Sequence, residues 1–202
     1  MADSRTVRSA PAATTAGALV LAGLLLAAGC ARGLEGPLAA VAKSLQPGER
    51  IVAVRDLDTV AARSLAVVVL APRSKPELRL YQIDERGRAA VALKAGQGDV
   101  FRNLALEDVD ADGRDEVIVT WRGGHLEMIE VIARGPDGAY RSIFRNAGRE
   151  IERRVGPSGA SDFWITSRTY EEKAGRPPDY DTVVYRFRDG AFAEVPRQET
   201  SR

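Results

Sequence analysis

The chain has 202 residues, of which 29 are basic and 28 acidic, so its formal net charge at pH 7 is only +1. Without a basic field, the chain is not expected to bind nucleic acid, and its moderate, dispersed proline and glycine indicate that most of it folds. Cys30 is the single cysteine, which excludes an intrachain disulfide and a thiolate metal cluster.

The first 29 residues have the three zones of a secretory signal peptide. Arg5 and Arg8 form a basic region, and an uncharged apolar run covers 16–28. This run of 13 residues is short for a transmembrane helix, which needs about 20. A short apolar core with a basic flank and small residues at its end indicates export.

The end of this segment, Leu26-Ala27-Ala28-Gly29-Cys30, resembles the lipobox of bacterial lipoproteins. Ala28 and Gly29 match that pattern, whereas Ala27 departs from its preferred leucine. The resemblance implies cleavage before Cys30 and a membrane anchor through lipid on that cysteine. Ala31 is not the aspartate of a retention signal, which favours the outer membrane over the inner one. An ordinary signal peptide and an uncleaved anchor are the alternatives.

Four segments are expected along the chain. A signal peptide (1–29) precedes a lipidated tether with a short helix (30–49), a β-repeat domain (50–196) and a flexible tail (197–202). The helix is expected over 36–45, where proline comes early and Leu38, Val41 and Leu45 follow at helical spacing. It either covers the first repeat against water or lies on a membrane surface, although Lys43 is its only lysine.

Markers of an internal repeat recur about every 52 residues. The sequence Asp-Leu-Asp at 56–58 returns as Asp-Val-Asp at 108–110, and turn glycines stand at Gly87, Gly138 and Gly190. Apolar strands with period-two patterns fall between these markers. They are expected at 50–55, 65–70, 78–83 and 89–93, then at 117–122, 126–132 and 139–145, and finally at 163–168, 182–187 and 191–195.

The predicted fold is therefore all-β, with about three antiparallel blade-like repeats of roughly 52 residues and a short N-terminal helix. One blade buries too little surface to stand alone, so the blades must pack on each other. Closed propellers generally need at least about four blades. An open stack, a fused sandwich and a ring completed by oligomerisation all remain open.

An acidic loop, Asp108-Val109-Asp110-Ala111-Asp112-Gly113-Arg114-Asp115-Glu116, carries the sharpest motif. Its carboxylates converge only if the chain coils tightly, which Gly113 permits. Oxygen ligands without histidine or cysteine suit calcium rather than zinc. The loop is not an EF-hand, because Val119 stands where that motif needs glutamate and a strand follows. A solvated acidic turn is the alternative.

This loop resembles the Asp-rich loop of FG-GAP and VCBS-type repeats, which joins two strands of a propeller blade and usually binds calcium. The resemblance implies one structural calcium site, and Asp115 has no matching role in it. Asp56 and Asp58 keep part of the pattern in the first repeat, and Asp162 is the only nearby acid in the third. The implied ligands are Asp108, Asp110, Asp112, the carbonyl of Arg114 and Glu116.

Few residues point to catalysis. His125 is the only histidine and stands in a loop, and the sequence has no Gly-x-Ser-x-Gly elbow. Trp121, Trp164 and Tyr170 either contact a ligand or fill gaps between blades. The expected function is a non-enzymatic envelope lipoprotein that contacts a protein or carbohydrate partner. A carboxylate-dependent hydrolase of envelope sugars or peptides, and a subunit of a larger ring, are the alternatives.

Overall fold

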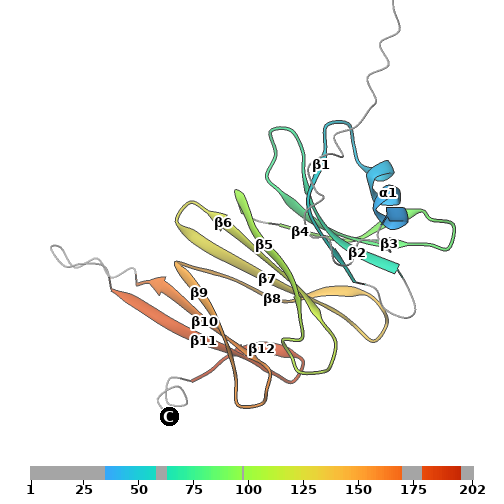
Figure 1. The fold of residues 1–202 in the computed structure, drawn as a ribbon. Helices are drawn as coiled ribbons and strands as arrows, with labels where there is room; N and C mark the ends of the chain where they lie inside the picture. Colours follow the sequence, from blue (N-terminus) through green and yellow to red (C-terminus); the bar gives the residue numbers. More distant parts are fainter. Residues whose placement is uncertain (1–34, 58–62, 97, 170–178, 197–202) are drawn as a thin grey trace, which may run out of the picture. The chain divides into compact units, whose positions relative to one another are not determined.

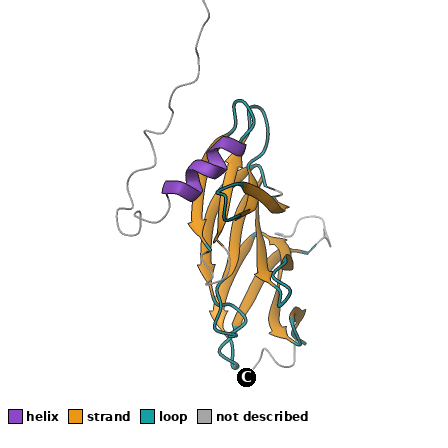
Figure 2. Cartoon of the chain, turned by 90° about the vertical axis from the view of Figure 1, so that its right-hand side faces the viewer, coloured by secondary structure: helices purple, strands orange, loops and turns teal. Residues whose placement is uncertain are grey.

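A computed structural model describes residues 35–57, 63–96, 98–169 and 179–196. The signal peptide, Cys30, Tyr170 and the tail at 197–202 lie outside these ranges. The described chain is built almost entirely of β-strands, with one short helix near its start (Figures 1 and 2). No helix in the described ranges combines the length and hydropathy that crossing a bilayer requires.

The strands form three separate four-stranded antiparallel sheets, each an up-and-down meander in chain order. This confirms the predicted all-β class, and no closed propeller is present among the described strands. The first sheet consists of β1 (Arg50–Asp56), β2 (Arg63–Leu70), β3 (Glu77–Ile83) and β4 (Ala89–Ala95). The second consists of β5 (Val100–Glu107), β6 (Glu116–Gly123), β7 (Leu126–Arg134) and β8 (Tyr140–Gly148). The third consists of β9 (Glu150–Val155), β10 (Ser161–Arg168), β11 (Tyr180–Arg188) and β12 (Ala191–Glu194).

The turns between the last two strands of each sheet repeat as the sequence predicts. Gly87, Gly138 and Gly190 have φ angles of 71°, 80° and 84° respectively. These left-handed conformations are easily adopted by glycine and strained for most other residues. The turns at 84–88 and 135–139 have the same pattern of backbone hydrogen bonds. The third turn is shorter and has a second positive φ angle, 53° at Asp189.

Alternation along β6 divides the middle sheet between two hydrophobic cores. Val117, Val119 and Trp121 point to a core shared with the first sheet, where Val68 and Leu80 lie. Ile118, between them in sequence, points to the opposite core. That second core is shared with the third sheet and includes Phe163 and Ile165. Both faces of the middle sheet are therefore buried, which explains why the run at 117–121 is apolar at nearly every position.

The two end sheets cover their remaining faces differently. α1 (Glu35–Ser44) lies over the first sheet, with Val41 fully buried against Leu65, Val67 and Tyr81. This placement agrees with the expectation that the helix covers the first repeat. On the third sheet, the face away from the middle sheet carries the ion pairs Asp162–Arg186 and Glu152–Arg154.

The second and third sheets approach closely at Gly148, the last residue of β8. A β-carbon added there would stand 2.6 Å from Cγ2 of Ile165 and 2.8 Å from the carbonyl oxygen of Thr166. The backbone is also joined here, because the amide of Arg149 donates to the same carbonyl at 2.7 Å. Only glycine fits at this crossing without a displacement.

We therefore expect Gly148→Ala to lower the free energy of unfolding by about 1–3 kcal/mol, the usual cost of overpacking. Gly36→Ala is the matched control, since a β-carbon there meets nothing within 4 Å and the residue lies in α1. The control should be neutral or stabilising by up to about 1 kcal/mol. Urea unfolding of the two variants measures both effects, and equal stabilities would contradict the close approach.

Candidate metal site

The acidic loop connects β5 to β6 and is coiled by its own side chains. The carboxylate of Asp108 accepts the backbone amides of Asp112 at 3.2 Å and Gly113 at 2.9 Å. Ala111 and Gly113 have positive φ angles of 64° and 86°. Gly113 thus makes the sharp turn that the sequence predicts for it, and the short polar side chains replace a regular hydrogen-bonding ladder.

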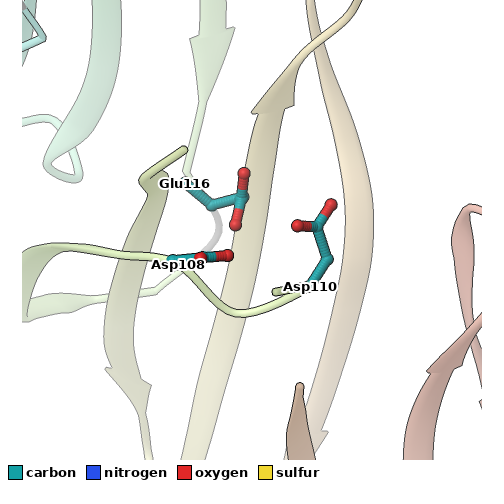
Figure 3. A group of neighbouring side chains, drawn as sticks. All are labelled: Asp108, Asp110 and Glu116. Carbon is teal, nitrogen blue, oxygen red and sulfur yellow. The ribbon is translucent and has the colours of Figure 1, made fainter. Parts of the chain in front are cut away.

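The coil brings together Asp108, Asp110 and Glu116, each of which offers one oxygen within 4.8 Å of the others. Figure 3 shows the three carboxylates facing one another across the turn. Asp108 is exposed, Asp110 is half-buried and Glu116 is buried. This is a group that could hold a metal ion, and it contains three of the four carboxylates named from the sequence.

Asp112, the fourth carboxylate, does not join the group. It forms an ion pair with Arg114, whose Nε donates to Oδ2 at 3.0 Å and whose backbone amide donates to Oδ1 at 2.9 Å. The arginine holds the pKa of Asp112 below its ordinary value, chiefly through the side-chain hydrogen bond. For Asp112 to become a metal ligand, its carboxylate would have to leave this guanidinium.

Glu116 is the acid of this loop that is most shielded from water, since only 3% of its surface is exposed. Its Oε2 accepts the backbone amide of Val109 at 2.9 Å. Burial, together with the nearby negative charges of Asp110, Asp112 and Asp108, raises its pKa from 4.5 to about 7, although the hydrogen bond from Val109 acts in the opposite direction. Among the described residues, no lysine or arginine forms an ion pair with Glu116. A buried carboxylate needs either a proton or a cation.

The equivalent positions of the other two sheets show how that need can be met. Glu116, Ser64 and Asp162 each stand one residue before the apolar run of the second strand, and all three are buried. In the third sheet, the Asp162 carboxylate accepts from Nε of Arg186 at 2.9 Å and from Nη2 at 2.7 Å. In the first sheet, Ser64 carries no charge. At this position, the middle sheet buries an acid, Glu116, with which no arginine of the described residues forms an ion pair.

The remaining members of the first-repeat motif are only partly described. Asp56 ends β1, whereas Asp58 lies outside the described residues. The expectation of a remnant site in the first repeat stays a prediction. In the third repeat, Asp162 pairs with Arg186.

The aromatic residues proposed as ligand contacts lie on different faces. Trp121 is 1% exposed and packs edge-to-face on Phe101, with ring centroids 5.8 Å apart. This burial matches the alternative that the tryptophan fills a gap between sheets. Trp164 lies on the outer face of the third sheet with the Arg154 guanidinium 4.1 Å over its ring. His125 is exposed, in the turn between β6 and β7.

A cavity of about 220 Å³ lies on the middle sheet, and sequence reasoning did not find it. Its lining includes one carboxylate, Glu130, which is buried and paired with Arg145. No second carboxylate is among the residues that line it. Glu130 and Arg145 are cross-strand partners on β7 and β8, a pairing that becomes visible only when the strand register is known.

We expect the pH dependence of stability to report the burial of Glu116. In metal-free buffer, a carboxyl group whose folded pKa exceeds its unfolded value stabilises the fold at low pH. That contribution is lost as pH rises from about 4.5 to about 7, and its full size is about 3 kcal/mol. Glu116→Gln should remove this slope, since the amide does not titrate.

Urea unfolding at pH 5, 6, 7 and 8 in the presence of a chelator makes this measurement. Asp115→Asn is the control, because Asp115 is an exposed acid of the same loop. If wild type and Glu116→Gln lost stability in parallel over this range, the electrostatic role assigned to Glu116 would be wrong.

Comparison of the chain with protein-family models, curated proteins and solved structures found no match in any of the three. The resemblance of the acidic loop to FG-GAP and VCBS-type repeats is therefore a prediction from the residues alone. The structure itself shows three meanders, two hydrophobic cores shared between sheets, and one group of three carboxylates that includes the buried Glu116.

Proposed function

We propose that this protein is an envelope-anchored lipoprotein whose β-repeat domain is a non-catalytic binding or structural module stabilised by one calcium ion. The observation that carries the proposal is the burial of Glu116 beside Asp108 and Asp110, with no basic partner among the residues that the structure describes. A divalent cation supplies the positive charge that Arg186 supplies to Asp162 in the third sheet.

Calcium fits the donors of this loop better than the common alternatives. The ligands are carboxylate oxygens, whereas zinc prefers histidine and cysteine. Calcium takes about 6–8 oxygens in flexible geometry, including backbone carbonyls and water. Asp108, Asp110 and Glu116 would hold the ion, with the Arg114 carbonyl and a displaced Asp112 as further candidates. The ion would screen the clustered negative charges and fix the turn.

The anchor follows from the N-terminal sequence rather than from the fold. The basic residues, the short apolar run and Cys30 support export and lipidation. In such a protein the β-repeat domain lies outside the cytoplasm, where extracellular calcium-binding modules have dissociation constants of about 10⁻⁴ to 10⁻³ M. A protein or carbohydrate of the envelope is the proposed partner.

A hydrolase is the second candidate, and the raised pKa of Glu116 favours it. A carboxyl group that titrates near neutral pH suits a general acid, and carboxylates lie nearby to assist it. Against this role, Glu116 is buried, and the cavity on the middle sheet is lined by a different acid, Glu130. Turnover of an envelope sugar or peptide that Glu116→Gln abolishes without unfolding the chain would favour this candidate.

Calorimetric titration of the protein in detergent should show one calcium ion bound per chain, with a dissociation constant of about 10⁻⁴ to 10⁻³ M. Asp110→Ala should weaken binding at least tenfold, because it removes a charged oxygen from the group. Asp115→Asn makes a similar charge change in the same loop and should leave binding unchanged. No heat of binding up to several millimolar calcium would overturn the calcium proposal.

Replacement of the cysteine tests the anchor separately. Cys30→Ser should abolish incorporation of labelled fatty acid and shift the protein from the membrane fraction to the aqueous fraction. Serine removes the thiol that would carry the lipid and leaves the domain unchanged. A matched Ser44→Ala change, in α1, should leave fractionation unaffected. Unaltered membrane attachment in Cys30→Ser would exclude lipid on this residue.

A further inference from the structure

Val109 stands between two of the proposed calcium ligands, Asp108 and Asp110, but its side chain points away from water. It is fully buried in the core shared by the second and third sheets, where Phe163 and Ile165 also lie. A loop that is acidic and exposed on one side thus inserts an apolar side chain between two sheets on the other.

The backbone of the same residue makes a second connection. Its amide donates to Oε2 of Glu116 at 2.9 Å, and its carbonyl accepts the amide of Ser161 at 2.8 Å. Ser161 is the first residue of β10 in the third sheet. One residue therefore links the buried carboxylate of the acidic loop directly to the neighbouring sheet.

The entry to the loop is tied to the third sheet as well. Glu107, the last residue of β5, forms an ion pair with Arg153 on β9. The loop is thus held against the third sheet by an ion pair just before it, and by an apolar side chain and a hydrogen bond within it. Its conformation and the position of the third sheet cannot vary independently.

We propose that cation binding in the acidic loop controls how firmly the third sheet docks on the second, with Val109 as the coupling residue. This inference rests on the proposed calcium function and goes beyond it, since it assigns the ion a regulatory role at the interface between two sheets. The bound ion fixes Asp108, Asp110 and Glu116, and so fixes the segment that carries Val109. Without the ion, mutual repulsion of the carboxylates draws Val109 away from its core site and from Ser161.

Linkage requires the effect to run in both directions. If calcium favours the docked third sheet, then docking of that sheet must raise calcium affinity by the same factor. A partner that binds and loosens the third sheet would therefore release calcium, and low calcium would expose the apolar side chains of Phe163 and Ile165.

Amide hydrogen exchange of the full chain in detergent, with calcium or with chelator, tests the proposal. Calcium should slow exchange in β10 and β11 at least about fivefold, the lower end of typical coupling between sites. Exchange in β2 and β3 of the first sheet should not change. Calorimetry on the same sample establishes whether calcium is bound.

Val109→Ala is the diagnostic variant, because it keeps every proposed ligand and removes the coupling side chain. It should still bind calcium, while the ratio of β10 exchange rates with and without calcium falls towards one. This ratio distinguishes coupling from simple destabilisation, which raises both rates. Val155→Ala is the matched control, since Val155 lies on β9 and is 81% exposed, and its ratio should equal that of the wild type.

The outcomes separate the two proposals. Bound calcium with no selective protection of the third sheet, or with equal protection of all three sheets, overturns the coupling and leaves the calcium site standing. Absence of calcium binding overturns the calcium site and the coupling together. A ratio in Val109→Ala equal to that of the wild type shows that Val109 does not transmit the effect.

Discussion

The fold depends on one constraint: a four-stranded sheet with two apolar faces is stable only when both faces are covered. The middle sheet meets this constraint with a neighbouring sheet on each side, so Val119 and Ile118 point into different cores. The first sheet meets it with the middle sheet and α1. The third sheet packs one face on the middle sheet, and its other face carries the Asp162–Arg186 ion pair and Arg154 over the ring of Trp164.

The same constraint explains why a buried polar position recurs. The second strand of each sheet begins at the margin of a core, where the chain enters from a solvated loop. Ser64, Glu116 and Asp162 are the buried residues at this margin in the three sheets. The serine needs no counter-charge and the aspartate has an arginine across the strand pair. Glu116 has no arginine paired with it among the described residues, so its carboxylate needs either a proton or a cation.

Much of this architecture can be predicted from the sequence, because short sequence patterns determine the turns and strands. Glycines in left-handed turns, period-two strands and the 52-residue spacing predicted the meanders, and the limits of most strands agree within one or two residues. No strand was predicted at 100–107 or 150–155. β5, with the sequence VFRNLALE, is largely apolar but lacks a period-two pattern and contains a bulge between Phe101 and Asn103. β9, with the sequence EIERRV, is exposed along most of its length and shows no apolar pattern.

The acidic residues of the candidate metal site could be predicted from the sequence, but their hydrogen-bond and ion-pair partners could not. The spacing of the acids identified Asp108, Asp110 and Glu116, whereas the capture of Asp112 by Arg114 depends on a side-chain choice within the coil. The burial of Glu116 and the pairing of Asp162 with Arg186 follow from sheet packing and register. No local pattern encodes these. The packing of Val109 against the third sheet could not be predicted either, because a single valine in an acidic loop does not indicate which sheet it contacts.

The charged outer face of the third sheet limits what can pack against it. Asp162 and Arg186 form an ion pair on this face, and the guanidinium of Arg154 lies over the ring of Trp164. An apolar surface placed there would remove these charged groups from water, at a cost on the order of several kcal/mol per ion. A further sheet of the same kind is therefore not expected to stack on this side.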